Sequence, residues 1–79
     1  MKIIVQYYAF LREERGVSSE AVETKAATAE QLYAELKAAH HFRLMAKDLR
    51  VAVNNEFSSW TQSLCDNDTV IFIPPVAGG

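Results

Sequence analysis

The sequence has few of the residues that cross-link or interrupt a chain. It contains one cysteine, Cys65, so no disulfide can form within the chain. This cysteine usage fits a reducing compartment, and we expect a cytoplasmic location. Only three glycines and two prolines occur among 79 residues, of which 49% are hydrophobic. Such a composition argues against a disordered chain and predicts one globular domain over residues 1–79.

Long hydrophobic runs and blocks of one charge are also missing. No stretch approaches the roughly 18 apolar residues of a membrane-spanning helix. The segment 1–10 lacks the apolar centre and cleavage site of a signal peptide. Eight basic and ten acidic residues give a formal charge of −2, with no basic cluster. We therefore expect neither a membrane nor a nucleic acid as partner.

Groups that could catalyse a reaction or bind a metal are equally sparse. His40 and His41 are adjacent at an expected helix end, so their side chains diverge, and no other His or Cys has ligand spacing. We expect no metal site. A nucleophile with its base cannot be assembled from these residues and Cys65, which we expect to be a small, partly buried residue. There is no glycine-rich phosphate loop for ATP, and a chain of this size has little room for a self-contained active site. We expect no stably bound cofactor and no enzyme activity in the chain by itself.

Runs of β-branched and aromatic residues predict the strands. In the first run, Gln6 is the one polar residue of the interior, and the alternation of a strand puts Tyr8 on the same face. Ile3, Val5 and Tyr7 then point to the core. The strands that we expect cover residues 2–8, 19–24, 51–54, 57–60 and 70–73.

Thr28 begins the clearest helix. Its hydroxyl can cap the free amides of the first turn, and Gln31 occupies the partner position of a capping box. Apolar residues at helical spacing follow, and the helix should end near His40. The stripe that we expect to be buried consists of Ala29, Leu32 and Leu36.

The remaining segments complete the predicted topology. Residues 10–16 should form a short helical turn ended by Gly16, which tolerates a left-handed backbone. Residues 41–50 fit either a short irregular helix or a loop, with Phe42, Met45 and Leu49 as packing candidates. Two strands, a long helix and further strands predict an α+β protein with a mixed sheet of about five strands and the main helix on one face. This is the ubiquitin-like β-grasp arrangement.

The C-terminal segment carries the most specific pattern. Residues 51–79, VAVNNEFSSWTQSLCDNDTVIFIPPVAGG, end in a strand, two prolines, two small residues and Gly78-Gly79. A terminal Gly-Gly alone is also typical of a frayed end, but the whole ending resembles the small subunit of molybdopterin synthase, the MoaD family. Residues 8–13, YAFLRE, resemble that family's segment after the first strand. Asn67 departs from the pattern, because many relatives carry Gly there, although Asn also tolerates left-handed backbone.

The resemblance implies that the end of the chain is a reactant. In this family a separate activating enzyme uses ATP to adenylate the terminal carboxylate, which here is that of Gly79. The transient acyl-adenylate then becomes a thiocarboxylate. The tail enters the large subunit of molybdopterin synthase, where its sulfur goes to the pyranopterin precursor of the molybdenum cofactor. The family's assembly implies two small and two large subunits.

The resemblance also implies a partner-binding surface. A flexible, extended tail of six residues, 74–79, can reach roughly 20 Å into a partner. Its small and glycine residues suit a narrow channel, and its prolines restrict the base. For the three apolar positions on the body, burial in the core is the competing interpretation. The tail residues are Pro74, Pro75, Val76, Ala77 and Gly78, and the body residues are Tyr8, Arg12, Phe57 and Ile73.

Other functions also fit the sequence. One is a different β-grasp sulfur carrier, such as the thiamine-pathway ThiS protein or a tRNA-thiolation carrier. ThiS is usually shorter and lacks the Phe-Ile-Pro-Pro-Val lead-in. Another is a ubiquitin-like modifier joined to lysines, and the last is a simple interaction domain with an incidental tail.

Overall fold

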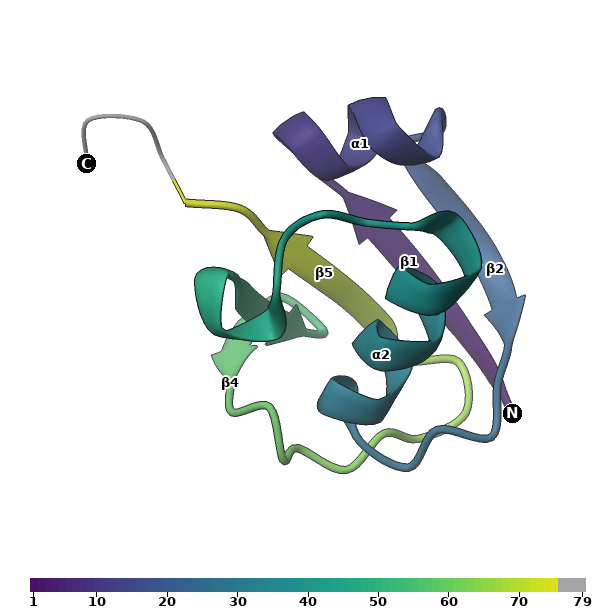
Figure 1. The fold of residues 1–79 in the computed structure, drawn as a ribbon. Helices are drawn as coiled ribbons and strands as arrows, with labels where there is room; N and C mark the ends of the chain where they lie inside the picture. Colours follow the sequence, from purple (N-terminus) through teal and green to yellow (C-terminus); the bar gives the residue numbers. More distant parts are fainter. Residues whose placement is uncertain (76–79) are drawn as a thin grey trace.

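The computed structural model describes residues 1–75, whose five strands form one mixed sheet in the order β2-β1-β5-β3-β4 (Figure 1). Strands β1 and β5 are parallel, and the other neighbours are antiparallel. Together with the main helix, α2, this arrangement confirms the predicted β-grasp fold. The elements are β1 (Lys2–Tyr7), α1 (Ala9–Arg15), β2 (Ser19–Glu23), α2 (Ala29–His40), the 3-10 helix η1 (Ala46–Asp48), β3 (Arg50–Val53), β4 (Glu56–Ser58) and β5 (Thr69–Ile73).

The sheet buries one face against α2, and β1 follows the predicted alternation. Ile3, Val5 and Tyr7 are buried in the core, whereas Gln6 is half-buried and Tyr8 is exposed. Because paired residues in a sheet share a face, the same side continues through the buried residues of the neighbouring strands. These are Val70 and Phe72 of β5 and Val51 of β3.

Helix α2 begins and packs as the sequence predicts. The Thr28 hydroxyl accepts a hydrogen bond from the backbone N–H of Gln31 at 3.3 Å. The Gln31 side chain reaches back to accept from the N–H of Ala27 at 2.8 Å, one residue before the expected capping-box partner. His41 adopts a left-handed conformation with φ 58° and ends the helix. The predicted stripe Ala29, Leu32 and Leu36 is buried.

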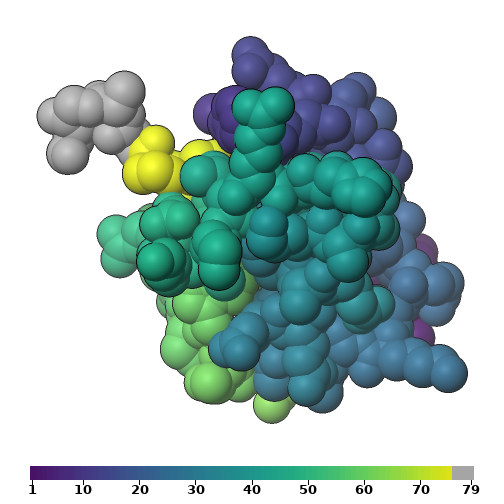
Figure 2. All heavy atoms as spheres, viewed as in Figure 1, coloured from purple at the N-terminus to yellow at the C-terminus, as the bar shows by residue number. Residues whose placement is uncertain are grey.

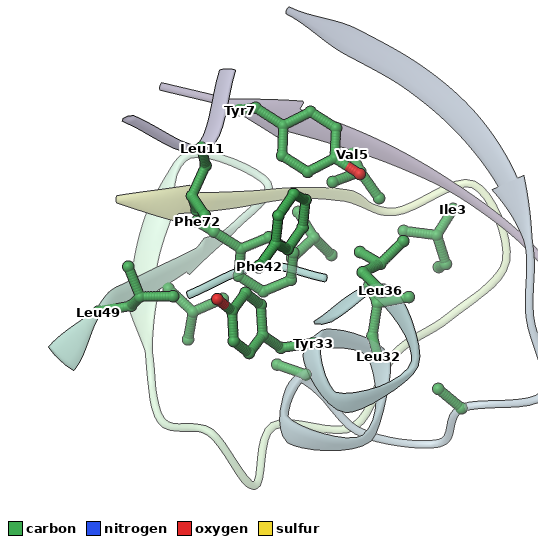
Figure 3. Packing of buried hydrophobic residues seen from close by; sticks show 14 of the residues in the cluster. Ile3, Val5, Tyr7, Leu11, Leu32, Tyr33, Leu36, Phe42, Leu49 and Phe72 are labelled. Atoms are coloured by element: carbon green, nitrogen blue, oxygen red, sulfur yellow. The ribbon is translucent and has the colours of Figure 1, made fainter. Parts of the chain in front are cut away.

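An aromatic cluster fills the space between α2 and the sheet. Tyr33 of α2 is central to this cluster, although it does not belong to the buried stripe that the sequence predicts. The ring of Tyr33 lies 5.0 Å from that of Phe72 and 6.1 Å from that of Phe42. Its hydroxyl donates to the carbonyl of Leu44 at 2.6 Å, and burial raises the pKa of Tyr33 to about 12. Figure 3 shows the rings of Tyr7, Phe42 and Tyr33 gathered between the strands and α2.

Three local expectations differ from the structure. Met45 is 52% exposed, because residues 41–50 form an irregular segment in which Phe42 and Leu49 are the buried residues. Strand β4 covers residues 56–58 rather than 57–60, since the tight Asn54–Asn55 turn pairs Val53 with Glu56. Cys65 is exposed rather than partly buried, because the preceding residue, Leu64, takes the inward position.

Candidate functional site

The base of the predicted tail leaves the sheet from one of its interior strands. Strand β5 lies between β1 and β3 and leads directly into Pro74, which is buried, and Pro75, which is exposed. The N-terminus lies at the opposite end of the sheet from this exit (Figure 1). Figure 2 shows the yellow atoms of the last described residues at the margin of the body. The other predicted tail residues, Val76, Ala77, Gly78 and Gly79, lie outside the described residues.

Strand register brings predicted docking residues to one face of the sheet. Arg50 pairs with Ile73, and Tyr8 follows Tyr7, which pairs with Phe72. Tyr8 keeps an extended backbone, φ −123° and ψ 151°, so its side chain falls on the same face as Ile73, opposite α2. The next row towards the centre of the sheet consists of Ile71, Ala52 and Phe57.

This outer sheet face is apolar and open near the tail. Tyr8 is 47% exposed and Phe57 is 65% exposed, while Ile73 is half-buried. Burial in the core is therefore the wrong interpretation for Tyr8 and Phe57. An exposed cluster of large apolar side chains is typical of a protein-binding surface. Arg12, the fourth predicted body residue, is exposed on α1, one helical turn after Tyr8.

A partly buried hydrogen-bond network, which the sequence does not predict, links α1 to the sheet. The Glu20 carboxylate of β2 accepts from the Tyr7 hydroxyl at 2.6 Å and from Arg15 Nε and Nη2 at 2.9 and 2.8 Å. The Arg15 hydrogen bonds hold the pKa of Glu20 below its ordinary value. Burial, followed by the Glu20 contact, raises the pKa of Tyr7. The network ties α1, β1 and β2 together and thereby positions the chain around Tyr8.

Residues 1–75 contain neither a cluster of metal-binding side chains nor a membrane-spanning helix. No group of three or more His, Cys, Asp or Glu side chains within that range is placed to hold a metal ion. No helix formed by those residues is both long and apolar enough to span a bilayer. Among residues 1–75, the outer sheet face beside Pro75 is the candidate functional site, because it exposes Tyr8 and Phe57.

The fold is that of a small ubiquitin-like β-grasp protein. A candidate docking surface lies beside Pro75, where the chain continues beyond β5. The sequence profile of the ThiS family matches residues 5–79. The chain therefore belongs to the ThiS family of β-grasp sulfur carriers.

Solved structures of similar proteins cover nearly the whole chain. The putative molybdopterin converting factor, subunit 1, from Pyrococcus furiosus is 31% identical, with a TM-score of 0.78 and coverage of 96% of this chain and 99% of the other. SAMP1 from Haloferax volcanii has 22% identity and a TM-score of 0.82, with both chains fully covered. A complex of subunits 1 and 2 of the molybdopterin-converting factor from Helicobacter pylori 26695 contains a chain with 21% identity and a TM-score of 0.70, again with full coverage. The last two similarities concern the fold.

Proposed function

We propose that this protein is the sulfur-carrier subunit of molybdopterin synthase. The observation that carries the proposal is its 31% identity, over 96% of its length, to a protein described as subunit 1 of a putative molybdopterin converting factor. The family match through residue 79 and the open apolar face beside Pro75 support it. The chain supplies the sulfur, and the catalytic pocket belongs to the partner.

The proposed chemistry takes place at the Gly79 carboxylate. A carboxylate resists nucleophilic attack, so a separate enzyme joins it to AMP from ATP, with release of pyrophosphate. Sulfur at the sulfide oxidation level then attacks the acyl carbon, AMP leaves, and a thiocarboxylate remains on Gly79. Its terminal sulfur attacks the pyranopterin precursor to form a thioester, and water then cleaves the acyl C–S bond, which leaves the sulfur on the precursor and restores the Gly79 carboxylate. Two loaded carriers are required for the two sulfurs of one dithiolene product.

The partner in this proposal is the large subunit, in an assembly of two small and two large chains. The outer sheet face, with Tyr8, Phe57 and Ile73, would dock on it, and Arg12 would contact it from α1. Pro75 would begin the inserted tail, while buried Pro74 anchors its base. Gly78 and Gly79 have no side chains, so a narrow channel can close around their backbone.

The proposal is tested by intact mass spectrometry after incubation with the activating enzyme, ATP and a sulfur donor. We expect the mass to rise by about 16 Da, the difference between sulfur and oxygen. A variant that lacks Gly79 should show no rise and should keep its fold. An unchanged mass of the wild-type chain, in an assay that loads a known carrier, would exclude a sulfur-carrier function.

A ubiquitin-like modifier is the second candidate. It is suggested by the similarity in fold to SAMP1, the small archaeal modifier protein 1 of Haloferax volcanii. A modifier would transfer Gly79 to a lysine amine of another protein, and this would add the mass of the chain to that protein. A thiamine-pathway carrier would instead deliver sulfur to a thiazole precursor, and a tRNA-thiolation carrier would deliver it to tRNA. Comparison of the acceptors separates these functions.

A further inference from the structure

A groove of about 460 Å³ lies beside the base of the tail. It is formed by η1, the start of β3, the hairpin strand β4 and the end of β5. Two of its residues, Phe57 and Ile73, also belong to the outer sheet face, so the groove and the candidate docking surface are continuous. The lining residues are Lys47, Asp48, Leu49, Arg50, Phe57, Ile73, Pro74 and Pro75.

The groove contains two basic side chains without an acidic partner in residues 1–75. Arg15 and Arg43 form ion pairs with Glu20 and Glu14, whereas Lys47 and Arg50 form none with described residues. Asp48 is the one acidic residue of the lining. The groove therefore has a local excess of positive charge in a protein whose formal charge is −2.

Arg50 is held in a geometry that suits a carboxylate. Its guanidinium carbon lies 4.6 Å from the centre of the Phe57 ring. This cation–π contact restricts the guanidinium, whose planar set of N–H donors matches a bidentate acceptor such as a carboxylate. The half-buried Ile73 and the exposed Pro75 supply apolar surface next to these donors.

We infer that this groove receives a segment of the partner protein that presents a carboxylate beside an apolar side chain. The apolar side chain lies against Ile73 and Pro75, and the carboxylate accepts hydrogen bonds from Arg50 and Lys47. Charge complementarity and continuity with the docking face both favour a partner segment as the occupant. The inference rests on the proposed function, because it takes the partner to be the molybdopterin synthase large subunit.

Zero-length carbodiimide coupling of the complex tests which carboxylate lies in the groove. The reagent joins an amine to a carboxylate in direct contact, and mass spectrometry of the digested complex maps the linked residues. We expect Lys47 to be linked to an Asp or Glu of the large subunit. Lys25 is exposed at the other end of the sheet and should not be linked to the partner. A link from Lys47 to Gly79 or to a second copy of this chain would overturn the inference.

Affinity measurements with charge variants test the energetic role of the groove. Arg50→Gln should raise the Kd for the large subunit by roughly tenfold, the size expected for one charge-assisted pair. Asp48→Asn should lower the Kd, because it removes the one negative charge of the lining. Lys25→Gln, the matched control, should leave the Kd unchanged, and all three variants should keep the wild-type Tm.

The outcomes separate the inference from the proposed function. Wild-type binding with an unchanged Kd for Arg50→Gln would overturn the acidic-segment inference and leave the proposed function in place. Failure of the wild-type chain to bind the large subunit would overturn both.

Discussion

At the scale of single residues, the Glu20 carboxylate is held by several contacts at once. It accepts three hydrogen bonds, from Tyr7 and from two nitrogens of Arg15. The sequence predicts the burial of Tyr7 from its position in the strand, because Gln6 identifies the opposite face. It does not predict the pairing, since Arg15 lies in a charged run that also fits a solvated helix face. Only the fold brings β2 beside the end of α1.

Glu20 should make the protein sensitive to acid. Its pKa is lowered in the folded state from the ordinary value of 4.5. The stabilisation is therefore present above about pH 4.5 and is lost as the pH falls through the lowered pKa. Urea unfolding at about pH 7 and about pH 3 should show a smaller loss of stability for Glu20→Gln than for wild type. Glu13→Gln, at an exposed site, should behave like wild type. Equal losses in all three proteins would contradict this role.

At the scale of elements, two short turns set the register of the sheet. Asn54 and Asn55 both have positive φ values, 52° and 70°, and allow the tight hairpin between β3 and β4. Asn67 has φ 71°, and its N–H donates to the carbonyl of Lys2 at 2.7 Å. The turn that leads into β5 is thereby fastened to the start of β1.

Asn67→Ala should destabilise the protein by about 1–2 kcal/mol, the cost of a left-handed conformation for an ordinary residue. Asn67→Gly should be close to neutral, because glycine adopts this backbone freely. Denaturant unfolding of the two variants measures the difference. Equal stability of the alanine and glycine variants would mean that the backbone of the turn rearranges.

Local signals decided which elements the sequence could predict. Helix α2 has a cap at Thr28 and a regular apolar stripe, and both were found in the structure. Residues 41–50 have neither, so their path depends on contacts of Phe42 with Tyr7 and Tyr33 that only the folded chain makes. The sequence also could not predict the groove beside Pro75, because its lining comes from three separate segments, residues 47–50, 57 and 73–75.

At the scale of the whole molecule, the two faces of the sheet differ in what covers them. One face packs on α2 and supplies the core. The other presents Tyr8, Ile73 and Phe57 near the point where the chain leaves β5. The sequence predicted this surface through one polar residue in β1 and a family resemblance, and the exposure of Tyr8 and Phe57 agrees with it.

Tyr8→Asp and Phe57→Asp should weaken binding of the large subunit by roughly tenfold or more, as expected for central apolar contacts. Their Tm should remain close to wild type, because both side chains are exposed. Val17→Asp, at a 40% exposed apolar residue between α1 and β2, is the matched control and should bind normally. A large fall in Tm for Tyr8→Asp or Phe57→Asp would show that these residues stabilise the fold instead.

The most direct test of the sulfur-carrier proposal is reconstitution with the large subunit and the pyranopterin precursor. We predict that the chain with a Gly79 thiocarboxylate yields molybdopterin, with two carriers consumed per product, and that the carboxylate form yields none. Absence of product from the thiocarboxylated chain, under conditions in which a known small subunit is active, would contradict the proposal.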